Sequence, residues 1–128
     1  MTKFVIDAYA WIEYLNGSEK GDKFGKILED NSNEIFTAAS TTAEVISKFL
    51  RANKDIKIAL TAINSMSILV NITQDIGSLA GQIHFEAKKK NKEFGMLDAF
   101  VAATARKINA KILTGDEDFR HFKDAIFI

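Results

Sequence analysis

Four acidic residues stand where an apolar run of this sequence ends or where a helix is expected to begin. They are Asp7, Glu44, Asp98 and Asp116. Binding sites of open parallel sheets form outside the carboxyl ends of the strands, so these four carboxylates are expected to gather at one edge of a sheet. Two carboxylates about 5 Å apart repel by roughly 3 kcal/mol at an effective dielectric constant near 20. A cluster of them therefore requires bound protons or cations.

The ligand atoms that such a cluster offers are all oxygens. Carboxylates without His or Cys suit a hard cation such as Mg²⁺ or Mn²⁺. Magnesium keeps several of its waters, so a few carboxylates suffice and positions remain for a phosphate oxygen and an attacking water. The predicted chemistry is metal-assisted hydrolysis of a phosphodiester bond.

Each acid also has a purely structural explanation. Asp7 and Asp98 could each cap the helix that follows. Thr41 and Glu44 have the spacing of a capping box, and Asp116 could close an Asx turn. The chemical interpretation therefore depends on whether the four residues converge.

Short apolar strands alternate with amphipathic helices along the whole chain. Strands are expected at residues 4–6, 34–37, 67–70, 111–114 and 125–128, and helices at 8–15, from 18 onward, at 40–51, at 56–66, after a cap at 73 or 75, and at 97–108. This alternation predicts a three-layer α/β/α sandwich with a central parallel sheet of four to five strands. With 128 residues and no proline, a single domain spanning residues 1–128 is expected.

Composition excludes several classes of protein. Lys plus Arg and Asp plus Glu both number 17, so the net charge is 0, which argues against nucleic-acid binding through bulk positive charge but leaves local basic patches possible. The absence of cysteine excludes disulfides, thiolate metal sites and cysteine nucleophiles. No signal-peptide pattern and no bilayer-spanning apolar run is found, so a soluble cytoplasmic protein is expected.

Four segments resemble, in order, the sequence motifs of the PIN-domain nucleases. They are FVIDAYAWIE at 4–13, TTAEV at 41–45, GMLDAFVAATA at 95–105 and ILTGDEDF at 112–119. A single short PIN domain most resembles the VapC-type toxins of type II toxin–antitoxin pairs. The resemblance implies a Mg²⁺- or Mn²⁺-dependent endoribonuclease that cuts RNA, forms a homodimer and is inhibited by a small antitoxin bound over the acidic site.

The same resemblance implies the roles of individual residues. The catalytic and metal-binding residues would be Asp7, Glu44, Asp98 and Asp116, with Asp7 and Asp98 as leading ligands. Thr114 could hydrogen-bond a ligand or water behind them, or be an ordinary strand-end threonine. Asp118 could assist Asp116, because alternation in an extended segment puts both on one side.

Several alternatives remain open at this point. The basic run of residues 88–90 with Lys92 could contact RNA phosphates, or be a solvated helix end favoured by the helix dipole. Arg51, Arg106 and Arg120 are further candidates for phosphate contacts. The protein could also be a PIN-like scaffold without catalysis, which the presence of all four acids disfavours, or a housekeeping RNA-processing nuclease without an antitoxin. Dimerisation is expected through apolar surfaces of the early helices.

Overall fold

Five parallel strands form the central sheet of the protein, which a computed structural model describes over residues 1–128. They are β1 (Thr2–Ile6), β2 (Asn33–Ala38), β3 (Ile68–Val70), β4 (Lys111–Thr114) and β5 (Ala125–Phe127). Their order across the sheet is β3-β2-β1-β4-β5, and every neighbouring pair is parallel. The predicted parallel sheet is confirmed, with five strands.

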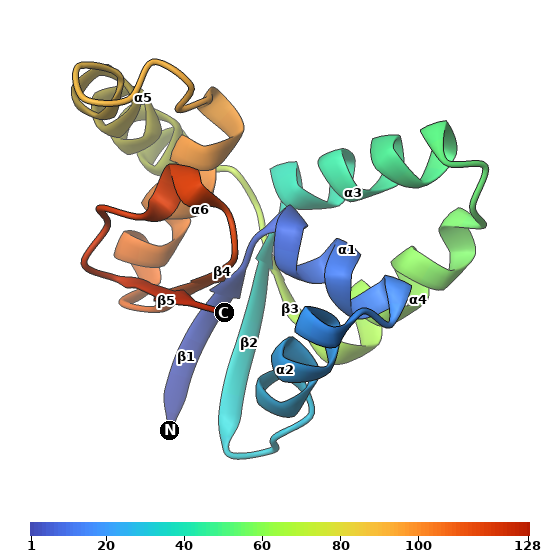
Figure 1. Ribbon diagram of the computed structural model, residues 1–128. Coiled ribbons are helices and arrows are strands. Elements are labelled where there is room, and N and C mark those ends of the chain that lie inside the picture. Colours follow the sequence, from blue (N-terminus) through green and yellow to red (C-terminus); the bar gives the residue numbers. More distant parts are fainter.

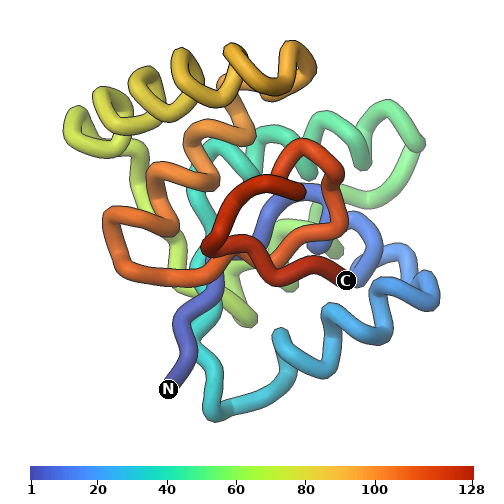
Figure 2. The backbone as a smooth tube through the Cα atoms, turned by 60° about the vertical axis from the view of Figure 1, so that its left-hand side comes forward, coloured from blue at the N-terminus to red at the C-terminus, as the bar shows by residue number.

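Six α-helices cover the two faces of this sheet. They are α1 (Ala8–Asn16), α2 (Glu19–Leu28), α3 (Ala39–Arg51), α4 (Ile56–Met66), α5 (Gln74–Lys88) and α6 (Met96–Ile108), and a short 3₁₀ helix, η1 (Glu117–Phe119), precedes β5. Helices α1 to α4 lie on one face, and α5 and α6 lie on the other (Figure 1). The turned view shows the C-terminal segment running beside α6 (Figure 2). None of these helices is long and apolar enough to cross a membrane.

Alternation of side chains along the strands gives the protein two hydrophobic cores. Val5 and Ile112 point into the core under α5 and α6, whereas Ile6 and Leu113 point into the core under α1 to α4. The second core holds Trp11, which is fully buried. Because the strands are covered on both faces, they read as continuous apolar runs in the sequence.

The first turns of α3 and α6 differ from the sequence-based expectation. The predicted capping box of Thr41 and Glu44 is wrong: α3 begins at Ala39, its N-cap is Ala38, and no side chain caps it. Strand β2 runs directly into α3, so Glu44 lies in the second helical turn and the buried Thr41 hydroxyl has no hydrogen-bond partner. Asp98 is the third residue of α6 rather than its N-cap, which is Gly95.

The order of the strands determines where a site can form. After β1 the chain builds β2 and β3 on one side, and later returns to place β4 on the other side of β1. The carboxyl ends of β1 and β4 therefore flank the topological switch point, where open α/β sheets bind their ligands. Ile6 pairs with Leu113. The residues that follow them, Asp7 and Thr114, therefore lie next to each other at the carboxyl ends of β1 and β4.

Candidate active site

Asp7 follows β1 directly and is buried, with 4% of its surface exposed. One carboxylate oxygen, Oδ1, accepts a hydrogen bond from the backbone N–H of Ala10 at 2.8 Å, so the expected N-cap role is confirmed. The other oxygen, Oδ2, accepts from the hydroxyl of Thr114. Capping α1 does not require this second bond, so the side chain is also fixed from the direction of β4.

Thr114 is a buried hydrogen-bond bridge between the two ends of the chain. Its hydroxyl donates to Asp7 and accepts from the backbone N–H of Asp116 at 2.9 Å. The bridge joins residues that are 107 positions apart in the sequence. It holds the turn after β4 against the start of α1.

The turn after β4 is shaped by Gly115 and Asp116. A Cβ atom on Gly115 would lie 2.4 Å from Cε1 of Tyr9, so a larger residue here would displace the Tyr9 ring from its packing against this backbone. Asp116 accepts from the backbone N–H of Asp118 at 2.9 Å, which confirms the predicted Asx turn and starts η1. Asp116 therefore caps η1 and also stands at the end of β4, where the site was predicted.

Three carboxylates meet above this turn. Asp98, Asp116 and Asp118 each contribute an oxygen, and these oxygens all lie within 4.8 Å of one another. Asp98 also accepts from the backbone N–H of Gly95 at 2.9 Å, and the side-chain amide of Asn91 donates to Asp118 at 3.1 Å. Asp118 is therefore a member of the group. Asn91 was not predicted, because no motif or spacing marks it in the sequence.

Burial and mutual repulsion raise the proton affinity of two of the site acids, Asp7 and Asp98. The pKa of Asp7 rises to about 7, chiefly because the side chain is buried; hydrogen bonds from Thr114 and a backbone amide oppose the shift, and the charges of Asp116 and Asp98 add to it. The pKa of Asp98 also rises to about 7, again first through burial and then through the charges of Asp116 and Asp118. Asp7 is thus electrostatically part of the cluster.

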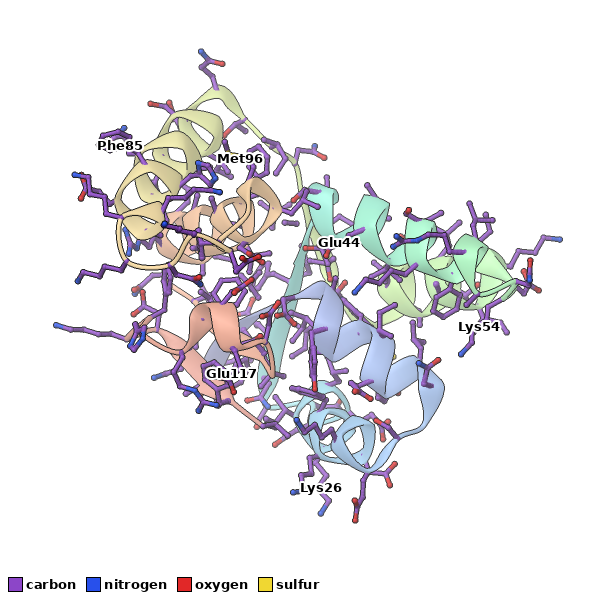
Figure 3. All side chains as sticks on the ribbon, turned by 45° about the horizontal axis from the view of Figure 1, so that its top comes forward. Lys26, Glu44, Lys54, Phe85, Met96 and Glu117 are labelled. Atoms are coloured by element: carbon purple, nitrogen blue, oxygen red, sulfur yellow. The ribbon has the colours of Figure 1, made fainter.

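Glu44 lies at the rim of the site. Its half-buried carboxyl has a raised pKa, mainly from burial, with Lys48 and Arg51 opposing the shift and the charge of Asp116 adding to it. Its label in Figure 3 lies at the beginning of α3. The residue is within electrostatic reach of Asp116 but outside the group of three.

No basic side chain neutralises the cluster. The ion pairs of the protein all lie on its surface: Glu86 with Lys89, Asp75 with Lys107, and Glu117 with Arg120. An all-carboxylate donor set without a cationic partner fits a hard divalent cation. Asp98, Asp116 and Asp118 could hold it, with Asp7 beside them.

Comparison with known proteins identifies the family. The family model of the PIN domain matches residues 4–125. The chain belongs to the PIN-domain family. In this PIN domain, all four sequence motifs that pointed to the family lie within the matched region.

Solved structures similar to this PIN domain include toxin–antitoxin proteins. VapBC2 from Rickettsia felis, bound to a promoter DNA fragment, has a TM-score of 0.75 at 15% identity, covering 99% of this chain and 98% of that one. VapC20 from Mycobacterium tuberculosis, a sarcin-ricin loop cleaving toxin, gives 0.76 at 16% identity, with 94% and 95% covered. A toxin–antitoxin complex from Klebsiella pneumoniae gives 0.74 at 22% identity, with 95% and 94% covered. At these identities the likeness establishes the fold. No curated protein sequence matches the chain.

Proposed function

We propose that this PIN domain is a Mg²⁺- or Mn²⁺-dependent endoribonuclease that hydrolyses RNA phosphodiester bonds in the cytoplasm, as the toxin of a type II toxin–antitoxin pair. One observation carries the proposal. Oxygens of Asp98, Asp116 and Asp118 lie within 4.8 Å of one another at the switch point of the sheet, and no basic side chain pairs with them. This arrangement costs stability unless a cation binds there.

The residues would divide the work as follows. Asp98 and Asp116 hold the cation, and Asp118, fixed by Asn91, completes its oxygen ligands. Asp7 approaches from β1 in an orientation set by the Thr114 hydroxyl. When bound, the divalent ion supplies Lewis-acid stabilisation of the phosphate and lowers the pKa of a bound water.

Glu44 has a separate part in this proposal. It stands at the rim with a raised pKa, so it can orient the attacking water or accept its proton. The pKa values of Asp7 and Asp98, both about 7, make protons compete with the cation near neutral pH. Cation affinity should therefore increase with pH through this range.

The proposed partners are a small antitoxin and a second copy of the chain. The similar structures from Rickettsia felis and Klebsiella pneumoniae are toxin–antitoxin complexes. For a homodimer, α3 and α4 offer exposed apolar side chains, Leu50 and Ile58, each 58% exposed. Light scattering at micromolar concentration tests the dimer, and a monomer there contradicts it. A neighbouring reading frame for a short DNA-binding protein would separate a toxin from a housekeeping nuclease.

The variant Asp98→Asn tests the proposed function. Asn keeps the shape of the side chain and can still accept the hydrogen bond from Gly95, but it removes a charge and a strong magnesium ligand. We expect RNA cleavage to be abolished while the fold is kept. Mg²⁺ should raise the melting temperature of the wild type by mass action, and raise that of the variant less.

The matched control is Asp75→Asn, an acid on the exposed start of α5 that pairs with Lys107 outside the site. It should cleave RNA and respond to Mg²⁺ like the wild type. Equal metal responses and undiminished cleavage in Asp98→Asn would contradict the assignment of Asp98.

A further inference from the structure

A groove of about 630 Å³ lies beside the acidic cluster rather than on it. Its walls are the later part of α5, the outer face of α6 near Arg106, and the segment from Asp118 to Asp124. These segments lie together in Figures 1 and 2. Asn91 and Asp118 line the groove and are also hydrogen-bonded to each other, so one carboxylate separates the groove from the proposed metal site.

Cations without acidic partners border this groove. Lys90, Arg106 and Lys123 line it, and none of them forms an ion pair or a side-chain hydrogen bond. The rest of the basic run is engaged elsewhere: Lys88 donates to the carbonyl of Lys92 at 2.9 Å, and Lys89 pairs with Glu86 at 3.1 Å. The structure thus singles out Lys90 from a run whose residues are indistinguishable in the sequence.

The acids of the groove are mostly engaged. Glu86 is held by Lys89, and Asp118 belongs to the carboxylate cluster and accepts from Asn91. Asp124 alone among the lining acids has no partner for its side chain. The hydrogen bond from Asn91 leaves the charge of Asp118 in place, so the three unpaired cations exceed the unpaired acids, Asp118 and Asp124, by one positive charge, in a protein whose net charge is 0.

The floor of the groove is apolar and partly aromatic. Phe122 is half-buried and stacks on the buried Phe94, with ring centroids 5.3 Å apart. Ile83 and Leu79 of α5 continue this floor. An aromatic floor with a cationic border is the combination that binds single-stranded nucleic acid, because bases stack on the rings and phosphates contact the cations.

We propose that this groove binds the part of a single-stranded RNA that flanks the phosphate to be cut. Arg106 lies eight residues beyond Asp98 on α6, roughly 12 Å along the helix axis, a distance that a short stretch of single strand can span. Lys90 and Arg106 contact phosphates, and a base lies on Phe122. This inference rests on the proposed function in one respect, namely that the RNA strand runs from the groove toward Asp118 and the metal site. Binding of RNA to the groove does not itself require cleavage.

Binding is measured in an Asp98→Asn background, so that RNA is not cut. The probe is a fluorescein-labelled single-stranded RNA of mixed sequence, and the readout is fluorescence anisotropy at several salt concentrations. Two double variants are compared. The groove pair combines Lys90→Ala and Arg106→Ala, and the control pair combines Lys26→Ala and Lys57→Ala. Lys26 and Lys57 are exposed, unpaired lysines on α2 and α4, in the other helical layer (Figure 3 labels Lys26). Both pairs remove two positive charges, and thermal melts verify that both remain folded.

We expect the groove pair to weaken RNA binding at 0.15 M salt by about fourfold per lost cation, and to reduce the salt slope by roughly 0.7 per cation, which is the counterion-release effect for single strands. The control pair should change neither. Phe122→Leu, which keeps an apolar side chain, should weaken binding about fivefold or more without changing the salt slope, because it removes a stacking surface.

Equal affinities for the groove pair and the control pair would overturn the proposal and leave a protein segment as the occupant to test. Failure of the proposed function gives a different pattern. If the wild type cuts no RNA while the groove pair binds RNA more weakly than the control pair, the groove binds RNA in a protein that is not a nuclease.

Discussion

Acidic side chains at the end of the sheet and acidic side chains on the outer surface are neutralised in different ways. On the surface, Glu86, Asp75 and Glu117 each pair with a lysine or arginine, and these acids keep more than two thirds of their side-chain surface exposed. At the sheet end, the four aspartates are buried or half-buried and form no ion pair, with only each other and hydrogen-bond donors as recorded partners: Asp7, Asp98, Asp116 and Asp118.

Three consecutive residues show the contrast within one turn of chain. Asp116 and Asp118 face the cluster, whereas Glu117 between them faces solvent and pairs with Arg120. The pKa of Glu117 is lowered by its arginine partner, while that of Asp98, which faces the cluster, is raised to about 7. Exposed pairs add little stability, and unpaired buried acids reduce it. The two regions therefore differ in how their negative charge is compensated: by basic side chains on the surface, and by no basic side chain at the carboxylate cluster of the sheet end.

The largest expected effect concerns the same three residues. Asp116→Asn or Asp118→Asn should each reduce RNA cleavage by roughly a hundredfold or more, because removing one metal ligand loses several kcal/mol of transition-state stabilisation. Glu117→Gln, the neighbour that points outward, should leave the rate nearly unchanged. Rates under single-turnover conditions at saturating Mg²⁺ give the comparison. If Asp118→Asn cleaves as fast as Glu117→Gln, Asp118 is not a ligand.

The second prediction concerns the stability of the metal-free protein against pH. The folded pKa values of Asp7 and Asp98, about 7, lie above the ordinary value of 3.8, so the folded state binds protons more tightly than the unfolded state. The resulting stabilisation is present below about pH 4, is lost as the pH rises to about 7, and changes little above it. The loss should be about 4 kcal/mol from Asp7, at about 1.4 kcal/mol per pKa unit, with a smaller contribution from the half-buried Asp98, whose charge solvent screens.

Urea denaturation in EDTA between pH 4.5 and pH 8 measures this dependence. Asp7→Asn should flatten it and make the metal-free protein more stable at pH 7.5, since Asn can still accept the bond from Ala10 without carrying a charge. A wild-type stability that rises with pH across this window would contradict the prediction.

A third, smaller effect is expected at the bridge between β1 and β4. Thr114→Val removes the hydrogen bond to Asp7 and the acceptor for the backbone N–H of Asp116. Leaving these buried groups unpaired should destabilise the protein by about 1–3 kcal/mol and raise the pKa of Asp7 further, because the Thr114 bond lowers it. Thr114→Ser, which keeps the hydroxyl, is the control. A valine variant as stable as the serine variant would show that the bridge contributes nothing.

The smallest effect is expected on the surface of α5. Glu86→Gln removes an exposed pair with Lys89 and should change the free energy of unfolding by less than about 0.5 kcal/mol. The same denaturation experiment measures it. A loss of stability as large as that of Thr114→Val would show that acids on the surface and acids at the sheet end contribute equally, contrary to the comparison made above.

The sequence by itself determined which elements form and where the four acids stand along the chain. Apolar runs such as 111–114 predicted strands, helical spacing predicted α4 at its observed bounds, and the residue types predicted the Asx turn at Asp116. These features depend on residues a few positions apart, so local patterns suffice. Helix α3 was expected from residue 40 and begins at Ala39, but the capping box of Thr41 and Glu44 was wrong. A helix that begins without a capping side chain leaves no capping signal in the sequence. The metal-binding roles of the four acids stay predictions.

Only the tertiary structure decided which acids meet and what lies beside them. Sheet order places β4 next to β1, which brings Thr114 to Asp7 across 107 positions. Packing of the Tyr9 ring leaves no room for a Cβ atom at position 115. The fold of the loop after α5 brings Asn91 to Asp118, and the packing of α5 against α6 sets Lys90 and Arg106 on one groove. Each of these contacts joins segments distant in sequence, so it depends on the arrangement of whole elements, which no local pattern encodes.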